Sequence, residues 1–321
     1  MGRRSGDHPA VARGSVVRPL FHSRNRDTAR LAATLARLAQ TDLTVLLEGE
    51  TGVGKSFVAR AIHRRSRPRR PFVVVDCGAI PEALLPSELF GHRAGAFTDA
   101  TRARQGWLAR AGDGTVVLDR IDALAPTSQV ALLRVVEERV FYPMGTATPR
   151  RLDARLIATA SAGIGARLLD GSLRADLYHR VAGFHAVLPA LRYRREDILP
   201  FAQATLRTLC RHAGVPRALD AEAEALLAAY PWPGNFRELA ATLERALLQS
   251  AGTSLGIADL GLPDEGWPAL AALAGERELP VDQVARLYGL FVLAHHGGNV
   301  TAAARVLGVS RRTLIRWRQA R

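Results

Sequence analysis

The stretch LLEGETGVGKSFVAR, Leu46–Arg60, decides the fold. Its core, Gly49–Ser56, fits the phosphate-binding pattern G-x-x-x-x-G-K-[ST], in which backbone N–H groups surround a phosphate. An apolar run of strand length, Leu43–Glu48, precedes the pattern, and helical spacing follows it. This order places an anion at a helix N-terminus, where free N–H groups and the helix dipole favour negative charge. The predicted phosphate-binding residues are Gly49, Glu50, Thr51, Gly52, Val53, Gly54, Lys55 and Ser56.

Lys55 is the only lysine among the 44 basic residues of the chain, and all the others are arginine. A lysine carries a compact ammonium on a slim stem, whereas an arginine carries a broad planar fork. A tight phosphate-binding loop has room for the first and not the second. We therefore predict that Lys55 binds the terminal phosphates of a nucleotide such as ATP, while the hydroxyl of Ser56 binds Mg²⁺.

A second Mg²⁺ ligand is expected at the end of a neighbouring strand. The segment GTVVLDRID supplies a short apolar run that ends at Asp119. An isolated strand-terminal aspartate would be unremarkable, but downstream of Lys55 it predicts a carboxylate ligand for Mg²⁺.

Strand-like and helical segments alternate through the first part of the chain, which predicts an α/β fold with a parallel sheet covered by helices. The expected strands are Leu43–Glu48, Phe72–Asp76, Thr115–Asp119, Arg155–Ala160 and Phe184–Leu188. After Pro189 the pattern becomes helical. We expect a flexible basic arm over 1–18, an α/β nucleotide-binding domain over 19–190, a helical lid over 191–252, a Gly/Pro-rich linker over 253–280 and an all-α domain over 281–321.

The net charge of +14 indicates an anionic partner, and nucleic acid is favoured over membrane because no amphipathic anchor is evident. A GC-rich genome would also raise the arginine content, but the charge is uneven: residues 305–321 contain six arginines and no acidic residue. Two cysteines, Cys77 and Cys210, suit a reducing compartment. No stretch is apolar enough to cross a membrane, so we expect a cytoplasmic protein.

The C-terminal segment GNVTAAARVLGVSRRTLIRWRQAR has the layout of a helix-turn-helix, with Gly308 at the turn and Ser310 capping the second helix. On that helix Leu314 and Trp317 are spaced to face a core. The side chains left for double-stranded DNA are those of Ser310, Arg311, Arg312, Thr313 and Arg316, with Arg318 also available for phosphates.

Taken together, these segments resemble the AAA+ transcription activators that act on sigma-54 RNA polymerase, the bacterial enhancer-binding proteins. The resemblance runs from about residue 20 to the C-terminus, in the family's order, through GETGVGKS, ELFGHRAGAFTDA, DGTVVLDRI, LRADLYHRV, LPALRYRREDI, WPGNFRELAATLERA and AAARVLGVSRRTLIRW. It implies an AAA+ sheet domain with a helical lid, followed by a Fis-type helix-turn-helix. The family's N-terminal regulatory domain is not expected, since fewer than 20 residues precede the AAA+ part.

The resemblance also implies roles for single residues. Arg174 and Arg180 match the arginine fingers that enter a neighbouring subunit's nucleotide site, and Arg237 matches the sensor-II arginine that reads the γ-phosphate. Fingers acting in trans imply a homo-oligomeric ring, similar to the family's hexamers, and the helix expected over 281–296 resembles the one through which such DNA-binding modules dimerise. Phe97 and Thr98 match the tip of the family's GAFTGA loop, which grips sigma-54.

Several positions depart from the family. The magnesium aspartate is followed in the family by a glutamate that polarises the attacking water, and here that position is Arg120. A general base is worth a factor of about 10²–10⁴ in rate, and arginine cannot act as one because it stays protonated in proteins. Asp76 stands where the family often has an asparagine, and Ser161 falls on the sensor-I position. We hypothesise that Asp76 and Arg120 form an ion pair.

The GAFTGA loop departs as well, because Asp99 replaces a glycine and Arg93 a glutamate. Two interpretations stay open. In one, ATP hydrolysis by an AAA+ ring drives the loop against sigma-54 polymerase holoenzyme. In the other, the protein is a hydrolysis-deficient, nucleotide-gated DNA-binding regulator that does not remodel polymerase. The C-terminal helix-turn-helix argues against a third class, a P-loop kinase or an AAA+ unfoldase.

Overall fold

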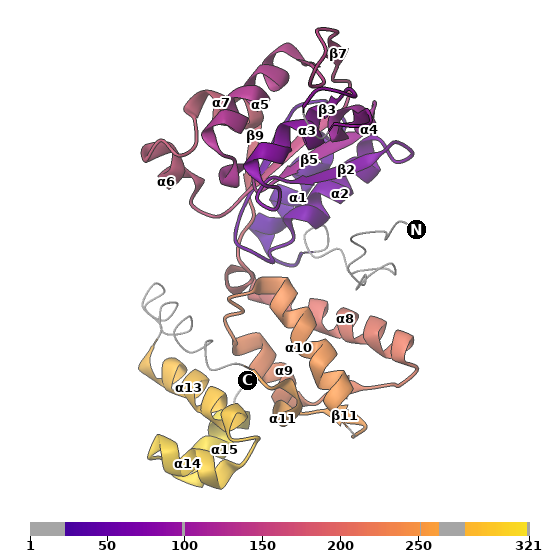
Figure 1. Cartoon of the computed structure of the whole chain (residues 1–321). Helices are drawn as coiled ribbons and strands as arrows, with labels where there is room; N and C mark the ends of the chain where they lie inside the picture. The colour runs from indigo at the N-terminus through magenta and orange to yellow at the C-terminus, as the bar shows by residue number, and fades with distance from the viewer. Residues whose placement is uncertain (1–22, 98–99, 251, 263–279, 320–321) are drawn as a thin grey trace. The chain divides into compact units, whose positions relative to one another are not determined.

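The computed structural model describes residues 23–97, 100–250, 252–262 and 280–319. The described residues divide into two compact units, one within Arg26–Pro189 and the other outside that range. The boundary at Pro189 agrees with the end of the predicted α/β domain. Figure 1 draws the first unit from indigo to rose and the helices of the second from salmon to yellow.

The first unit is built on the predicted parallel sheet, whose strand order is β2-β5-β8-β1-β9. All five strands are confirmed; their bounds are β1 Val45–Glu48, β2 Phe72–Asp76, β5 Thr115–Asp119, β8 Arg155–Ala160 and β9 Phe184–Val187. The three central strands are buried along their length except at Asp119, as expected for a parallel sheet with both faces covered. Parallel pairing brings the carboxyl ends of the strands to one edge, where Asp76 lies directly beside Asp119.

Helices cover the sheet on both faces. One face of the sheet packs against residues of α3, α4, α5 and α7 in a continuous apolar core, while α2 contacts β1, β5 and β8, and α1 packs on α2. The bounds are α1 Arg26–Leu38, α2 Lys55–Ser66, α3 Leu85–Phe90, α4 Trp107–Ala111, α5 Pro126–Glu138, α6 Ile164–Leu169 and α7 Ala175–Val181. Short 3₁₀ turns lie at Glu82–Leu84 and Ile121–Ala123.

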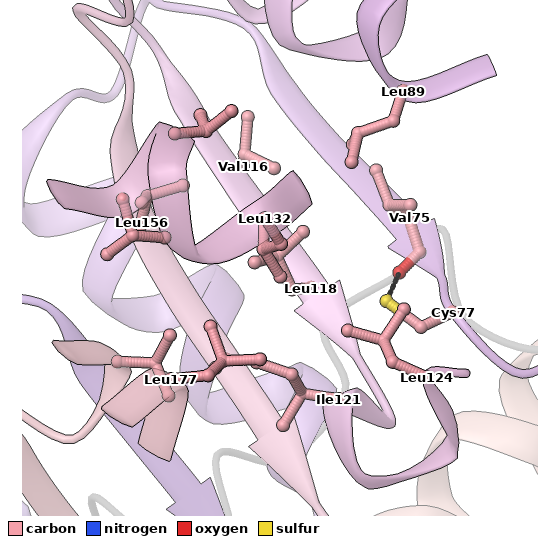
Figure 2. Close-up of a cluster of buried hydrophobic side chains, with 14 of the residues drawn as sticks. Val75, Cys77, Leu89, Val116, Leu118, Ile121, Leu124, Leu132, Leu156 and Leu177 are labelled. Carbon is pink, nitrogen blue, oxygen red and sulfur yellow. Dashed lines mark hydrogen bonds between the residues drawn. The ribbon is translucent and has the colours of Figure 1, made fainter. Parts of the chain in front are cut away.

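Figure 2 shows part of this core, in which Val116 and Leu118 of β5 and Leu156 of β8 face Leu132 of α5. Cys77, just after β2, lies among these side chains, and its thiol is 3.8 Å from the carbonyl oxygen of Val75. Cys77 is a buried free thiol.

Two short antiparallel hairpins extend the unit. One pairs β3 Gly91–His92 with β4 Arg104–Gln105, and the other pairs β6 Val140–Phe141 with β7 Arg150–Arg151. Backbone hydrogen bonds join the two hairpins: the Met144 N–H donates to the Gly91 carbonyl at 2.8 Å, and the Arg93 N–H to the Met144 carbonyl at 3.1 Å.

The second unit is helical, as predicted. Its elements are α8 Ile198–Ala213, α9 Ala221–Ala229, α10 Asn235–Gln249, α11 Ile257–Leu260, α13 Val281–His295, α14 Val300–Leu307 and α15 Arg311–Gln319, with the 3₁₀ turns Leu191–Tyr193 and Arg195–Asp197 and a small parallel pair, β10 Ala218–Leu219 and β11 Ser254–Leu255. One apolar core joins the lid helices to the C-terminal helices.

The linker was expected over 253–280, but the first residues of this range belong to the folded lid. Leu255, Ile257 and Leu260 are buried in the core of the helical unit, so β11 and α11 belong to the lid. The glycine and proline content of the segment indicated a linker, although three apolar residues in it, spaced two and three apart, pack in the core. Residues 263–279 and the arm over 1–18 lie outside the described residues. Among the described helices, none combines the length and the apolar character needed to cross a membrane.

Candidate nucleotide site and DNA-binding helices

The loop between β1 and α2 has the backbone that the glycine pattern requires. Gly52 and Gly54 have φ values of 81° and 102°, which residues with a side chain rarely adopt. A Cβ at Gly49 would lie 2.9 Å from the Leu188 carbonyl oxygen. The helix begins at Lys55, so the N–H groups of its first turn face the loop.

Lys55 folds over this loop. Its ammonium Nζ donates hydrogen bonds to the carbonyl oxygens of Gly49 at 2.5 Å and Glu50 at 3.1 Å. Both carbonyls belong to the loop itself, so the lysine charge stands at the mouth of the cradle that the sequence predicts. The slim lysine stem reaches them where a planar guanidinium would be too broad.

Asp119 ends β5, and β8 is the one strand between it and the loop that follows β1. The spacing of neighbouring strands puts the two strand ends about 10 Å apart. The Asp119 Oδ1 atom accepts a hydrogen bond of 2.6 Å from the hydroxyl of Thr159, which is fully buried on β8. A hydroxyl at Ser56 and a carboxylate at Asp119 are oxygen donors of the kind Mg²⁺ prefers, so these residues fit the metal.

Sequence reasoning missed Thr159. The signal was a single hydroxyl residue inside the otherwise apolar run Leu156–Ala160. Its oxygen also accepts the backbone N–H of Arg120 at 3.0 Å. One buried hydroxyl therefore fixes both Asp119 and the residue that follows it.

The hypothesised ion pair between Asp76 and Arg120 is confirmed. The Arg120 Nε and Nη2 atoms lie 3.0 Å and 2.5 Å from the same Asp76 oxygen, Oδ1. Arg120 has φ 58° and ψ 54°, the left-handed conformation, and its guanidinium packs over Gly78, where a Cβ would be 2.7 Å away. The hydrogen bond to Asp76 raises the pKa of Arg120 above its ordinary value. The cation is therefore fixed beside Asp119.

Sequence reasoning also missed Glu48, a buried carboxylate at the end of β1. Glu48 accepts the Gly163 N–H at 2.7 Å and the Ile164 N–H at 3.3 Å, at the start of α6, and its other oxygen lies 2.7 Å from Nε2 of His185. The hydroxyl of Tyr178 on α7 lies 3.2 Å from Nδ1 of the same ring. These contacts position the residue just before the phosphate-binding loop.

The arginines matched to the family's fingers are exposed on and before α7, and each has an acidic neighbour. Arg174 lies 2.7 Å from Asp176, and Arg180 lies 2.8 Å from Glu137 on α5. Arg237 is exposed on α10 of the helical unit. Their roles toward a nucleotide stay predictions. The backbone N–H of Ser161, at the sensor-I position, donates to buried Asp122 at 3.3 Å.

Phe97, on the loop after β3, is 39% exposed, and its ring packs edge-on against His92 with centroids 5.0 Å apart. Thr98 and Asp99 lie outside the described residues. Contact of this loop with sigma-54 stays a prediction.

The two C-terminal helices have the expected geometry. Gly308 has φ 66° between α14 and α15, and the hydroxyl of Ser310 accepts the Thr313 N–H at 3.0 Å, as a helix cap does. Leu314 is buried, while Arg311, Arg312 and Arg316 are exposed.

Arg318 also has a partner within the chain, because its Nε lies 2.8 Å from a carboxylate oxygen of Glu222 on α9. This contact joins the helix-turn-helix to the lid. The availability of Arg318 for phosphates stays a prediction.

Comparison with known proteins matches three family descriptions along the chain. They are "Sigma-54 interaction domain" over residues 21–186, "AAA+ ATPase lid domain" over 192–264 and "Bacterial regulatory protein, Fis family" over 292–319. The lid match extends past residue 252, in agreement with the buried residues of β11 and α11.

Characterised relatives are similar over most of the chain. The transcriptional regulatory protein ZraR of Klebsiella oxytoca is 40% identical over 288 residues, which is 89% of this chain and 65% of that protein. The regulatory protein AtoC of Escherichia coli is 39% identical over 290 residues, 87% of this chain and 63% of AtoC. The chain thus spans just under two thirds of the length of these relatives.

Crystal structures of NtrX from Brucella abortus are also similar. The complex with ADP has a TM-score of 0.69 at 28% identity, and the complex with ATP 0.68 at 30% identity. The matches cover 91% and 92% of this chain and 68% of the NtrX chain. The chain therefore belongs to the family of bacterial regulatory proteins that carry a sigma-54 interaction domain.

Proposed function

We propose that the protein is a DNA-binding transcription regulator whose AAA+ unit binds ATP with Mg²⁺. The observation that carries the nucleotide site is the cradle after β1, with Lys55 at its mouth and Asp119 held two strands away by Thr159. The NtrX relatives crystallised with ADP and ATP support the same ligand.

In this site the loop N–H groups and Lys55 bind the phosphates, and Ser56 and Asp119 hold Mg²⁺. The bound metal would neutralise phosphate charge. Thr159 keeps the Asp119 carboxylate oriented through the 2.6 Å hydrogen bond. The family resemblance assigns Arg174 and Arg180 to the nucleotide site of a neighbouring subunit, and Arg237 to the lid over the chain's own site. Fingers that act on a neighbouring subunit imply a homo-oligomeric ring.

Nucleotide binding is tested by equilibrium titration of the full chain with a fluorescent ATP analogue and Mg²⁺. Lys55→Ala should abolish binding, and Lys55→Arg should weaken it strongly because the planar fork does not fit the loop. Arg64→Lys, at the far end of α2, is the matched control and should bind as the parent does. Unimpaired binding by Lys55→Ala would refute the assignment.

DNA binding is assigned to α14 and α15, because exposed Arg311, Arg312 and Arg316 line one side of α15 while Leu314 anchors the other in the core. The affinity for duplex DNA should fall steeply as salt rises, since each neutralised phosphate adds about 0.9 to the slope of log K against log salt. Arg312→Ala should lower both affinity and slope. A flat salt response would refute the assignment.

The remaining question is hydrolysis. Two forms are open: a ring that hydrolyses ATP and works on sigma-54 RNA polymerase holoenzyme, and a nucleotide-gated DNA-binding regulator without turnover. The ion pair between Arg120 and Asp76 favours the second form, because a guanidinium occupies the position of the family's catalytic glutamate. In this form ATP sets the oligomeric state, and occupancy of DNA does the regulating.

A further inference from the structure

A cavity lies between the β3–β4 hairpin and the loop of the β6–β7 hairpin, outside the nucleotide site. Its volume is about 650 Å³, within the range of small-molecule sites, about 300–1,000 Å³. None of its lining residues belongs to the phosphate-binding loop. The side chains that define its chemistry are Phe90, His92, Arg93, Arg104, Thr148 and Arg150.

The lining is strongly basic. Three arginines, Arg93, Arg104 and Arg150, line this one cavity. Arg104 forms an ion pair with Glu88, whereas Arg93 and Arg150 have no ion-pair partner among the described residues. Asp99 is the only acidic residue in the sequence of 91–105 and 140–151. Like charges held together in this way are stabilised by an anionic ligand.

The wall of the cavity is also fixed in place. His92 Nε2 lies 3.1 Å from the Arg102 carbonyl oxygen, which can only accept, so this nitrogen carries a proton. Its Nδ1 lies 2.8 Å from the Ser87 hydroxyl. Both ring nitrogens are therefore engaged, and the residue that lines the cavity also packs its ring edge-on against Phe97.

The two loops that enclose the cavity are in direct contact. A Cβ at Gly145 would lie 2.9 Å from the Cβ of Ala96, and Met144 exchanges backbone hydrogen bonds with Gly91 and Arg93. A ligand that contacts both Arg93, just after β3, and Arg150, at the start of β7, would bridge the two hairpins. Guanidinium forks suit oxyanions with two oxygens, phosphate or carboxylate.

We propose that this cavity binds a small organic polyanion, bearing phosphate or carboxylate groups, through Arg93, Arg104 and Arg150. The ligand sits at the base of the loop that carries Phe97. The site does not depend on nucleotide binding at Lys55.

The test is isothermal titration of the full chain carrying Lys55→Ala, which removes phosphate binding at the nucleotide loop. The probes are pyrophosphate and citrate at fixed salt. At least one should bind with a Kd below about 1 mM, the weak end of specific binding. Tighter binding of pyrophosphate assigns a phosphorylated ligand, and tighter binding of citrate a carboxylate.

The double variant Arg93→Ala with Arg150→Ala should raise the Kd of the probe at least about tenfold for each charge-assisted hydrogen bond lost. Ala103→Trp, which fills the cavity without changing charge, should abolish binding. Arg64→Ala, an exposed arginine on α2, should leave it unchanged. Circular dichroism checks that each variant is folded. The proposal is overturned if neither probe binds, or if both the charge-removing and the cavity-filling variants bind as the parent does.

Discussion

Arg120 and Asp76 are joined across the neighbouring strands β5 and β2 by two contacts to one carboxylate oxygen, at 3.0 and 2.5 Å. The pair lies next to Asp119, whose own oxygen is held by Thr159. A guanidinium stays protonated in proteins and cannot take a proton from water. The edge of the sheet thus keeps the groups expected to bind nucleotide and metal, and replaces the group expected to activate water.

Arg120→Glu should lower stability, because it removes the ion pair and sets two carboxylates side by side. Both side chains are nearly half exposed, at 46% and 44%, so the loss is of order 1 kcal/mol. That corresponds to a fall of about 2–4 °C in Tm for a unit of this size. Differential scanning calorimetry measures it.

The control for that experiment is the double variant Asp76→Asn with Arg120→Glu, which removes the like-charge contact and should recover most of the lost Tm. Unchanged melting of Arg120→Glu alone would show that the pair contributes nothing.

Thr159→Val should destabilise the sheet unit by about 1–3 kcal/mol, because it leaves the Arg120 N–H and an Asp119 oxygen without their buried partner. Thr159→Ser keeps the hydroxyl and serves as the control. The two variants should differ most in how much Mg²⁺ increases their affinity for nucleotide. We expect Thr159→Ser to keep this increase and Thr159→Val to reduce it. Equal metal dependence in both would show that Thr159 has only a structural role.

Stability should fall as the pH is lowered from 7.5 to 5, in part because of His63. Its ring is 5% exposed, lies 2.9 Å from the Thr115 hydroxyl, and has its pKa lowered by burial and by the charge of Arg60. The unfolded chain takes up a proton near the ordinary pKa of about 6.5, while the folded chain resists it. The stability that neutral His63 contributes to the folded protein is therefore fully present above about pH 6.5, the ordinary pKa. It is lost as the pH falls through the lowered pKa of the folded state.

Urea unfolding at a series of pH values compares the parent with His63→Gln. The variant should be less stable at pH 7.5 and should lose less stability on acidification. An identical pH dependence in the two proteins would contradict this role for His63.

The two thiols should differ sharply in reactivity. Burial, and then the Asp76 carboxylate, raise the pKa of Cys77 to about 12, and its side chain is 5% exposed. Cys210, on α8, is only partly buried. Iodoacetamide at pH 8 should label Cys210 in the folded protein and Cys77 only after unfolding in guanidinium, as mass spectrometry would show. Equal labelling of both in the folded protein would contradict the buried position of Cys77.

The sheet and the nucleotide loop could be predicted because their signals are local. Continuous apolar runs indicated the five strands, and the glycine pattern indicated the loop before Lys55. The ion pair of Arg120 was predictable as well. Asp76 ends one strand, Arg120 directly follows the end of another, and both residues differ from those that the family has at two positions that contact each other.

Other contacts could not be predicted, because they depend on which strands are neighbours. The hydrogen bond from Thr159 to Asp119 follows from the order β5-β8-β1, which local patterns do not contain. The pairing of Arg318 with Glu222 joins residues nearly a hundred positions apart. The basic cavity is formed by two hairpins whose strands are two residues long, too short to leave a periodic pattern.

The most direct test of the proposed function is the steady-state ATPase rate of the full chain over a series of protein concentrations. Lys55→Ala serves as the blank, and Asp76→Asn with Arg120→Glu as the restored site. We predict that the parent binds ATP yet shows no turnover above the blank at any concentration, while the double variant gains activity. A parent rate that rises with concentration and disappears in Lys55→Ala would contradict the nucleotide-gated form, and would show a ring that hydrolyses ATP without the glutamate.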